Sequence, residues 1–414
     1  MTCIDRTALA ALDTADPLAG FRDAFVLPPG LIYLDGNSLG AQPRRAVDIA
    51  SRVLEDEWAQ GLIRSWNDAG WYALPRRLGD KIARLIGARA GEVVMTDSTS
   101  VNLFKVLNAA LDLAPGRRVI VSERDNFPTD LYIAEGIARL RARGHELRLV
   151  DRPSDLAAAI DADCAVVMLT HVNYRDGSMH DMARLTGLAH ERGALVVWDL
   201  AHSAGAVPLD LDAWAVDFAV GCTYKYLNGG PGAPAFVHVA ERWHSVCVQP
   251  LSGWWGHAAP FAFEAGFRPE AGIGAFLVGT PPVLSMAVAE AGIDLMLEAT
   301  LPRVREKSVA LGQAFIALVE QQCAGLGLEL ASPPGAAARG SQVSFRHAQG
   351  YAIMQALGAR GVIGDYREPG ILRFGFAPLY LRHVDIWDAV TLLRDVLATR
   401  AWDRAQHHAR RAVT

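Results

Sequence analysis

The sequence predicts an α/β protein in which a mostly parallel, seven-stranded-type sheet carries helices on both faces, followed by a smaller α+β C-terminal domain. Two observations predict this fold class. From residue 92 onward, short runs rich in β-branched residues alternate with stretches of helical pattern, an order typical of parallel sheets. The runs are also apolar throughout, as expected for strands that are buried on both faces.

The strands of the large sheet are expected in the following order. The run "EVVMT" (92–96) precedes the helical stretch "VNLFKVLNAALDL", and "RVIVS" (118–122) precedes "DLYIAEGIARLRARG". Further strands are predicted over 147–150, 164–172, 194–200, 218–222 and 233–239. Ligands of such sheets bind beyond the carboxyl ends of the strands. The residues that follow each strand are therefore the candidates for a functional site.

The pattern changes near residue 300. A long amphipathic helix runs through "LPRVREKSVALGQAFIALVEQQCAG", and the strand-like runs "SQVSFRH" and "ILRFGFA" then flank another helix. We predict three parts: an N-terminal segment over residues 1–50 that joins the small domain, a large ligand-binding domain over 51–300, and the small C-terminal domain over 301–414.

Composition argues against several classes of function. The 414 residues are 51% hydrophobic and carry a net charge of −5, and no basic block indicates nucleic acid. No signal-peptide pattern is present, and prolines break the longest uncharged run (271–289), so no membrane span is expected. The histidines lack metal-ligand spacing such as HExxH. The five cysteines (3, 164, 222, 247 and 323) form no CxxC pair, which favours a reducing cytoplasm over disulfides or zinc.

Two strand ends offer groups that suit a phosphate and a planar ring. Thr99 and Ser100 lie where a helix begins after the first strand, and hydroxyls, free amides and the helix dipole at such a place favour a phosphate. Phe127 follows the second strand and could stack on a planar ligand. Taken singly, a plain helix cap and a core phenylalanine are the commoner explanations of these residues.

The next strand ends carry charged residues. Asp199 ends the apolar run "ALVVWD", and His202 follows one turn later. A buried carboxylate needs a cation or donors, so Asp199 is either a helix cap or the partner of a protonated ring nitrogen. Lys225 follows the next strand in "GCTYKYLNGGPG". It is either a snorkelling surface residue or a nucleophilic amine held among aromatic rings.

Together these residues indicate one chemistry. A phosphate-binding helix start, a stacking ring, a strand-end aspartate and a strand-end lysine fall on one edge of one sheet. They are the groups that pyridoxal 5'-phosphate requires, with Lys225 as the Schiff-base lysine. The residues themselves therefore predict a pyridoxal-phosphate enzyme that acts on an amino acid.

Longer motifs carry a resemblance to a known family. The pattern "DLAHSAG" followed by "YK" and "GGPG" resembles the fold-type-I pyridoxal-phosphate enzymes of the class-V aminotransferase group. The segments "IYLDGNSLG", "TDSTSVNLFK", "NFPTDLYIAEG", "THVNYRDGSMHDM", "QPLSGWWGH" and "GVIGDYREPGILRFGFAPLY" resemble the kynureninase family along nearly the whole chain.

The resemblance implies a role for each matching residue. The catalytic residues are Lys225 and Tyr224, and the substrate-binding residues are Arg373, Asn37 and Trp66. The cofactor-binding residues, which also include Lys225 and Tyr224, are Thr99, Ser100, Phe127, Pro128, Thr129, Asp130, Thr170, Asp199, His202, Trp254 and Thr280. Trp254 and Thr280 match residues that reach the cofactor of a neighbouring subunit, so the resemblance implies a homodimer with shared active sites.

The implied reaction is the hydrolysis of L-kynurenine, and possibly of its 3-hydroxy derivative, to anthranilate or 3-hydroxyanthranilate and L-alanine. A transaminase or a cysteine desulfurase is the alternative within the same cofactor class; a desulfurase needs a reactive cysteine on a mobile loop, whereas Cys323 lies in a helical run. The match of "GNSLG" to G-x-S-x-G is interpreted as chance, because no strand and helix of a parallel sheet surround it. A regulator that merely binds the cofactor would need a DNA-binding module, which the first ninety or so residues do not show.

Arg373 also stands out without the resemblance. In "ILRFGFA", Leu372, Phe374 and Phe376 alternate to one face of the predicted strand, so Arg373 points the other way. A guanidinium in such a strand favours a planar, bidentate anion such as a carboxylate. A structural salt bridge is the alternative interpretation.

Overall fold

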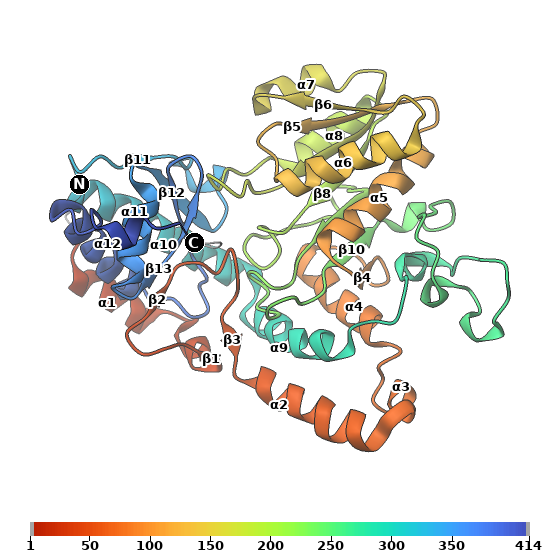
Figure 1. Cartoon of the computed structure of the whole chain (residues 1–414), viewed down its shortest axis with the longest axis horizontal. Coiled ribbons are helices and arrows are strands. Elements are labelled where there is room, and N and C mark those ends of the chain that lie inside the picture. The colour runs from red at the N-terminus through yellow and green to blue at the C-terminus, as the bar shows by residue number, and fades with distance from the viewer. Residues whose placement is uncertain (1–3, 411–414) are drawn as a thin grey trace.

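The computed structural model describes residues 4–410 and contains a large sheet flanked by helices (Figure 1). Its seven strands run in the order β4-β10-β9-β8-β7-β5-β6. In chain order they are β4 (Val93–Met95), β5 (Val119–Glu123), β6 (Glu146–Val150), β7 (Cys164–Thr170), β8 (Leu195–Asp199), β9 (Phe218–Gly221) and β10 (Phe236–Val239). Every pair from β9 to β6 is parallel, which confirms the predicted mostly parallel sheet.

The apolar strands are explained by a core on each face of the sheet. Val93 and Met95 belong to one hydrophobic cluster, whereas Val94, between them, belongs to the other. Successive side chains of a strand point to opposite faces. A strand between two cores therefore needs apolar side chains on both of its faces, and the mostly apolar runs follow.

Helices cover both faces. Helices α5 (Thr99–Leu113) and α6 (Pro128–Arg141) contribute to the core that contains Val94. Helices α4 (Leu74–Ile86), α8 (Met182–Glu191) and α9 (Val283–Ala299) contribute to the core that contains Val93. Figure 1 shows α5 and α6 side by side across one face of the sheet. The N-termini of α5 and α6 therefore lie just beyond the carboxyl ends of the strands that precede them.

Strand β10 departs from the parallel arrangement. It is antiparallel to both of its neighbours, β9 and β4. The connection from β9 to β10, residues 222–235, contains no helix, and parallel neighbours usually need a helical crossover. This connection carries Lys225, so the lysine lies on the loop that follows the carboxyl end of β9.

The C-terminal part is built on a second, antiparallel sheet. Its order is β11-β12-β15-β14, with bounds Glu329–Leu330, Gln342–Arg346, Ile371–Gly375 and Asp365–Arg367. The predicted long helix is α10 (Leu301–Gln322), and α11 (Gly350–Gly358) and α12 (His383–Ala398) complete this region. The two predicted strand-like runs pair with each other as β12 and β15.

The N-terminal segment lies against the C-terminal part, as Figure 1 shows. Helix α1 (Arg6–Ala15) packs on α12, and β2 (Ile32–Tyr33) pairs in parallel with β13 (Val362–Ile363). The chain then enters α2 (Arg45–Arg52), which continues as a π-helical stretch over Val53–Gly61 and packs on α9. Residues 34–40 are thereby held between the two sheets.

Two further features concern membranes and cysteines. Within residues 4–410, no helix combines the length and apolarity that a bilayer crossing needs. The uncharged run 271–289 forms a 3-10 turn over Gly272–Phe276 and the start of α9. Cys3 lies outside the described residues, and Cys164, Cys222, Cys247 and Cys323 are free and buried.

Candidate active site

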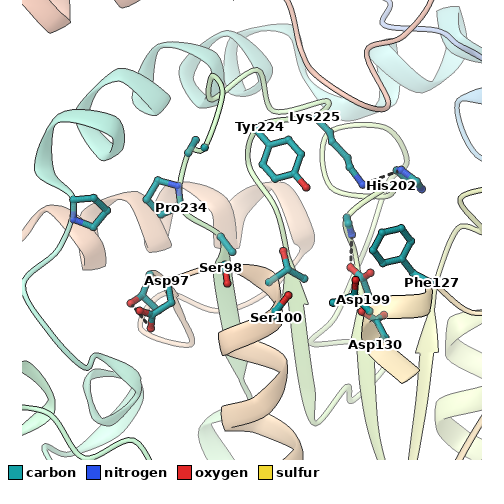
Figure 2. A pocket seen from close by; sticks show the side chains of 18 of the residues that line it. Asp97, Ser98, Ser100, Phe127, Asp130, Asp199, His202, Tyr224, Lys225 and Pro234 are labelled. Atoms are coloured by element: carbon teal, nitrogen blue, oxygen red, sulfur yellow. Dashed lines mark hydrogen bonds between the residues drawn. The ribbon is translucent and has the colours of Figure 1, made fainter. Parts of the chain in front are cut away.

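A cavity of about 530 Å³ opens at the carboxyl ends of the large-sheet strands. Figure 2 shows the start of α5 on one side of it and Phe127 with two aspartates on the other, with Tyr224 and Lys225 above. Eleven of the residues predicted from the sequence line it: Thr99, Ser100, Phe127, Thr129, Asp130, Thr170, Asp199, His202, Tyr224, Lys225 and Thr280. Pro128 occupies the first turn of α6.

One wall of the cavity is the N-terminus of α5. Its cap is Ser98, whose hydroxyl accepts from the backbone amide of Val101 at 3.3 Å. Thr99 and Ser100 therefore lie in the first turn, where backbone amides lack intrahelical acceptors. The helix dipole adds partial positive charge there. This wall has the donors that a phosphate needs.

An ion pair lies behind that wall. The Lys105 ammonium donates to Asp97 Oδ2 at 2.7 Å and to the carbonyl of Phe276 at 2.7 Å. The Lys105 side chain is 0% exposed, whereas Asp97 is 28% exposed and lines the cavity. Burial lowers the pKa of Lys105. The pair links the loop before α5 to the segment that leads to Thr280.

The opposite wall holds two buried carboxyl groups. Asp199 ends β8 and accepts from the amide of Ala201 at 2.7 Å, and Asp130 lies in the first turn of α6. Burial raises the pKa of both, and the neighbouring charge of Asp199 raises that of Asp130 further. Both carboxyl groups cannot easily ionise together at such a place. The charge of Lys225 already lowers the pKa of both carboxyl groups in part, and a protonated ring nitrogen would favour ionisation further.

Lys225 points toward His202. Its Nζ lies 3.0 Å from His202 Nε2, as Figure 2 shows. Burial, together with the charge of Lys225, keeps the pKa of His202 well below its usual range, so the ring is neutral beside the amine. The same Nε2 lies 3.1 Å from the backbone carbonyl of Asn37. Lys225 Nζ also lies 6.0 Å from the ring centre of Phe127 and 5.9 Å from that of Tyr224.

Phe127 presents a ring to the cavity. It is the residue before α6 and remains 37% exposed, although it makes an edge contact with Tyr174 at 5.2 Å between ring centres. Its backbone amide donates to Asn126 Oδ1 at 2.7 Å, and Asn126 also accepts from the hydroxyl of Thr170. These bonds fix the place of the ring, which can stack on a planar ligand.

The segment "DGNSLG" packs directly on the lysine loop. Gly40 donates its amide to the carbonyl of Tyr224 at 2.8 Å, and a Cβ at Gly40 would lie 2.4 Å from the carbonyl oxygen of Lys225. Only glycine permits this approach. The hydroxyl of Ser38 contacts Asp365 at 2.9 Å and Arg373 at 2.6 Å. Ser38 therefore has a structural role, unlike the serine of a nucleophile elbow.

Arg373 and Asn37 lie together beside this segment. Arg373 is 1% exposed, and its Nη1 donates to the carbonyl of Tyr174 at 2.6 Å. Its Nη2 pairs with Asp365. In the orientation that satisfies both of its polar atoms, the Asn37 amide oxygen accepts from Arg373 Nε at 3.0 Å. The structure thus brings Arg373 and Asn37 together and, through the Asn37 carbonyl, next to His202.

Trp66 and Trp254 lie in an aromatic cluster. Their ring centres are 5.2 Å and 4.8 Å from that of Trp255, which also stacks on Tyr72 at 5.2 Å. Within residues 4–410, Trp66 and Trp254 are not among the residues that line the cavity. The sequence names both, and the structure places them on one cluster outside the cavity wall of the single chain.

Comparison with known proteins decides the family. The chain is 59% identical over 413 residues to a kynureninase of Burkholderia pseudomallei, covering 99% of each chain. The chain belongs to the kynureninase family. It is also 56% identical over 413 residues to a kynureninase of Pseudomonas fluorescens, again with 99% of each chain covered. Residues 304–393 match the kynureninase C-terminal domain, and residues 57–210 match the DegT/DnrJ/EryC1/StrS aminotransferase family.

Solved structures that share the fold of this chain include a cysteine desulfurase and a cystine C–S lyase. A cysteine desulfurase from Thermococcus onnurineus superimposes with a TM-score of 0.79 at 20% identity, covering 92% of this chain and 98% of that chain. A cystine C–S lyase with glycine linked to its pyridoxal phosphate gives a TM-score of 0.75 at 17% identity, covering 95% of this chain and 100% of that chain. At this identity the likeness concerns the fold.

The cofactor of the kynureninase family, pyridoxal phosphate, fits the groups in this cavity. The first turn of α5 offers amide and hydroxyl donors for the phosphate, and the carboxyl pair offers a partner for the ring nitrogen. Phe127 offers a stacking surface, and Lys225 offers a primary amine. The carboxyl pair is the strongest of these observations, because its burial costs free energy unless a cation approaches.

Several residues of this kynureninase-family site escaped the sequence analysis. Asn126 and Tyr174 support Phe127, Lys105 pairs with Asp97, and Asp365 pairs with Arg373. Asp365 lies directly opposite Arg373 in the register of β14 and β15. The sequence "GDYREPGILRFG" contains both residues, but the register of a strand pair is not legible from it.

Proposed function

We propose that the protein hydrolyses L-kynurenine to anthranilate and L-alanine with pyridoxal phosphate held in this cavity. One observation carries the proposal: the amine of Lys225, the buried pair of Asp130 and Asp199, and the first turn of α5 line a single cavity. The same cavity takes the 3-hydroxy derivative in this proposal, because one added hydroxyl changes preference little unless a polar partner awaits it.

The proposed cofactor contacts follow from the walls of the cavity. Thr99, Ser100 and the hydroxyl of Tyr224 hold the phosphate, Phe127 stacks on the ring, and Asp199 pairs with the ring nitrogen. The remaining proposed contacts are Pro128, Thr129, Asp130, Thr170, His202 and Lys225. When bound, the cofactor supplies an electron sink that stabilises a carbanion on the amino acid.

The protein's own residues move the protons. Lys225 takes the proton from the substrate α-carbon, and neutral His202, at 3.0 Å, orients the amine through a hydrogen bond. The neighbouring Cys222 and burial raise the pKa of Tyr224, so its hydroxyl stays protonated and can donate. In the overall reaction water adds across the Cβ–Cγ bond. The hydroxyl goes to Cγ, which becomes the carboxyl of anthranilate, and a proton goes to Cβ, which becomes the methyl of alanine.

The proposed substrate contacts are Arg373, Asn37 and Trp66, which, in the described part of the single chain, are not among the residues that line the cavity with Lys225. We propose that Arg373 binds the α-carboxylate of the substrate and that Asn37, which touches both Arg373 and His202, lines the same site. Trp66 is proposed to contact the aromatic ring of the substrate. A guanidinium offers paired donors that match a carboxylate.

A homodimer with shared active sites is part of the proposal. Trp254 is 40% exposed, and Phe261 and Phe263 nearby are 68% and 86% exposed. Exposed aromatic groups of this size support a protein interface. In such a dimer we propose that Trp254 and Thr280 reach the cofactor of the neighbouring subunit, which requires the cavity that Thr280 lines in the single chain to lie at the interface. We also propose the division at residues 50 and 300 and a cytoplasmic location.

Buried cysteines argue against a desulfurase. Burial raises the pKa of Cys323 to about 11 and those of Cys164 and Cys247 to about 12, and it raises that of Cys222 as well. A reactive cysteine needs an exposed, easily ionised thiol. None of the cysteines within residues 4–410 meets this requirement.

The test is the release of anthranilate from kynurenine and of 3-hydroxyanthranilate from 3-hydroxykynurenine, each followed by its fluorescence. We expect cleavage of at least one of the two by the cofactor-loaded protein and loss of cleavage in Lys225→Ala. Failure with both substrates would refute the named reaction. Anthranilate release by Lys225→Ala would refute the role of the lysine.

A further inference from the structure

Arg373 has an internal carboxylate partner. Asp365 in β14 faces Arg373 in β15, and its Oδ2 pairs with Arg373 Nη2. The two side chains are 3% and 1% exposed, so the pair is shielded from water. A shielded ion pair is weakly screened by salt. Any second carboxylate that approaches Arg373 therefore competes with Asp365.

Every nitrogen of the Arg373 guanidinium is already engaged. Nη1 donates to the carbonyl of Tyr174 at 2.6 Å, Nη2 contacts Ser38 Oγ at 2.6 Å as well as Asp365, and Nε donates to Asn37 at 3.0 Å. A substrate carboxylate needs two donors on one edge of a guanidinium for a bidentate bond. At least one existing contact must open first. The contact with Asp365 is the one that a carboxylate can replace with equal charge.

Asp365 is built to release Arg373 without becoming unpaired. Arg367 holds both of its carboxylate oxygens, with Nη1 at 2.9 Å from Oδ1 and Nη2 at 2.7 Å from Oδ2. When Arg373 turns to another carboxylate, Asp365 retains this bidentate partner. The movement of Arg373 therefore does not leave the buried Asp365 carboxylate without a cation, which would cost free energy. Arg367 is 35% exposed at its side chain, so it lies on the outer side of the group.

We propose that Asp365 is an internal competitor for the α-carboxylate site, which holds Arg373 between turnovers and takes it back when the product amino acid leaves. The inference rests on the proposed function, in which Arg373 binds the α-carboxylate. L-Alanine keeps the same α-carboxylate as the substrate. The Arg373 contact alone therefore cannot favour departure of the product, whereas a competing carboxylate in the protein lowers the affinity for it.

The direction in which Asp365→Asn changes the affinity for L-alanine separates this role from a structural one. In Asp365→Asn the side chain keeps its shape and loses its charge, so L-alanine should bind the cofactor-loaded protein about tenfold more tightly. If Asp365 only held Arg373 in place, its loss would weaken binding. Arg367→Met should have the opposite effect, because Asp365 would then depend on Arg373, and we expect about threefold weaker binding of L-alanine.

The experiment is calorimetric titration of L-alanine into the cofactor-loaded wild type and both variants. Asp388→Asn is the matched control, since Asp388 also pairs with an arginine, Arg6, at 2.9 Å on the surface of the C-terminal part; its affinity should equal that of the wild type. Unchanged or weaker binding in Asp365→Asn overturns the proposal. If Asp365→Asn does not fold, Arg367→Met decides, and unchanged or tighter binding in that variant overturns it.

Failure of the proposed function can be distinguished from failure of the competitor role of Asp365. Arg373→Lys should weaken L-alanine binding if Arg373 is the α-carboxylate site. Equal affinity of Arg373→Lys and wild type for L-alanine would refute the premise that Arg373 binds the α-carboxylate. Weaker L-alanine binding by Arg373→Lys, without tighter binding by Asp365→Asn, would refute only the competitor role of Asp365. Cleavage of kynurenine by the wild type is measured separately and does not depend on either outcome.

Discussion

Lys225 and His202 are in direct contact, with 3.0 Å between Nζ and Nε2. The histidine is neutral because burial and the lysine charge lower its pKa. We expect His202→Leu to lower kcat by about tenfold, because the variant removes the hydrogen-bond partner of the amine. His202→Gln, which can still form a hydrogen bond, should lose less. The check is kcat for kynurenine in both variants, and equal losses would contradict a hydrogen-bonding role.

The carboxyl pair predicts a pH dependence of the cofactor-free protein. The ordinary pKa of Asp130 is 3.8, and burial with the Asp199 charge raises it in the folded state. Above pH 3.8 the unfolded chain releases this proton while the folded protein retains it. The folded state therefore binds more protons in this window, and the contribution of Asp130 to the free energy of unfolding falls as pH rises.

The Asp130→Asn variant lacks the carboxyl group whose proton uptake gives this pH dependence. At pH 8 we expect the variant to be more stable than the wild type by about 1 kcal/mol without cofactor, and near pH 3.5 the difference should vanish. The same variant should bind pyridoxal phosphate more weakly, since a carboxyl group that can ionise beside a cationic ring is lost. Urea unfolding at several pH values measures the first effect. A stability difference that is independent of pH would exclude the carboxyl pair as its source.

Two serines at the start of α5 are expected to have different roles. Ser98 caps the helix, and Ser100 is proposed to bind the cofactor. Ser98→Ala should lower the free energy of unfolding of the cofactor-free protein by about 1 kcal/mol, because the cap bond to Val101 is lost. Ser100→Ala should leave that stability unchanged and weaken the affinity for pyridoxal phosphate by about fivefold. Urea unfolding and cofactor titration followed by fluorescence distinguish the two. If Ser100→Ala destabilises the cofactor-free protein as much as Ser98→Ala does, the separation fails.

The pair of Lys105 and Asp97 should be stabilising as a unit. Lys105→Met leaves Asp97 without its cation and should cost about 2 kcal/mol, less than for a fully buried pair because Asp97 is partly exposed. Adding Asp97→Asn should restore part of the loss. The coupling is read from a double-mutant cycle of urea unfolding. Additive losses would mean that the two residues act independently.

The exposed aromatic residues predict a dimer interface. Phe263, 86% exposed, already has a left-handed backbone (φ 53°) that aspartate tolerates. Phe263→Asp should shift the protein toward monomers and reduce activity, because a charge would enter an apolar interface. Tyr132→Asp, an exposed aromatic residue on α6 at 66%, is the control. Light scattering after gel filtration measures the mass, and a wild-type monomer would contradict the interface.

Local sequence determined the strand-end part of the site. Asp199 and Lys225 are each preceded by an apolar run, and Thr99 and Ser100 precede an apolar helix. Since parallel strands end at one edge of a sheet, residues that follow different strands meet there. That rule needs only the order of strands and helices. It places Thr99, Ser100, Phe127, Asp199 and Lys225 around one cavity, as the structure does.

Tertiary structure alone decided which partners these residues have. Asn37 reaches His202 from a segment 165 positions earlier in the chain, and Arg373 meets Asp365 only through the register of β14 and β15. Trp66 and Trp254 meet on Trp255. Register and packing between distant segments depend on the whole core. The sequence alone therefore identified the groups proposed to carry the chemistry, and the folded chain decided which side chains hold Lys225 and Arg373 in place.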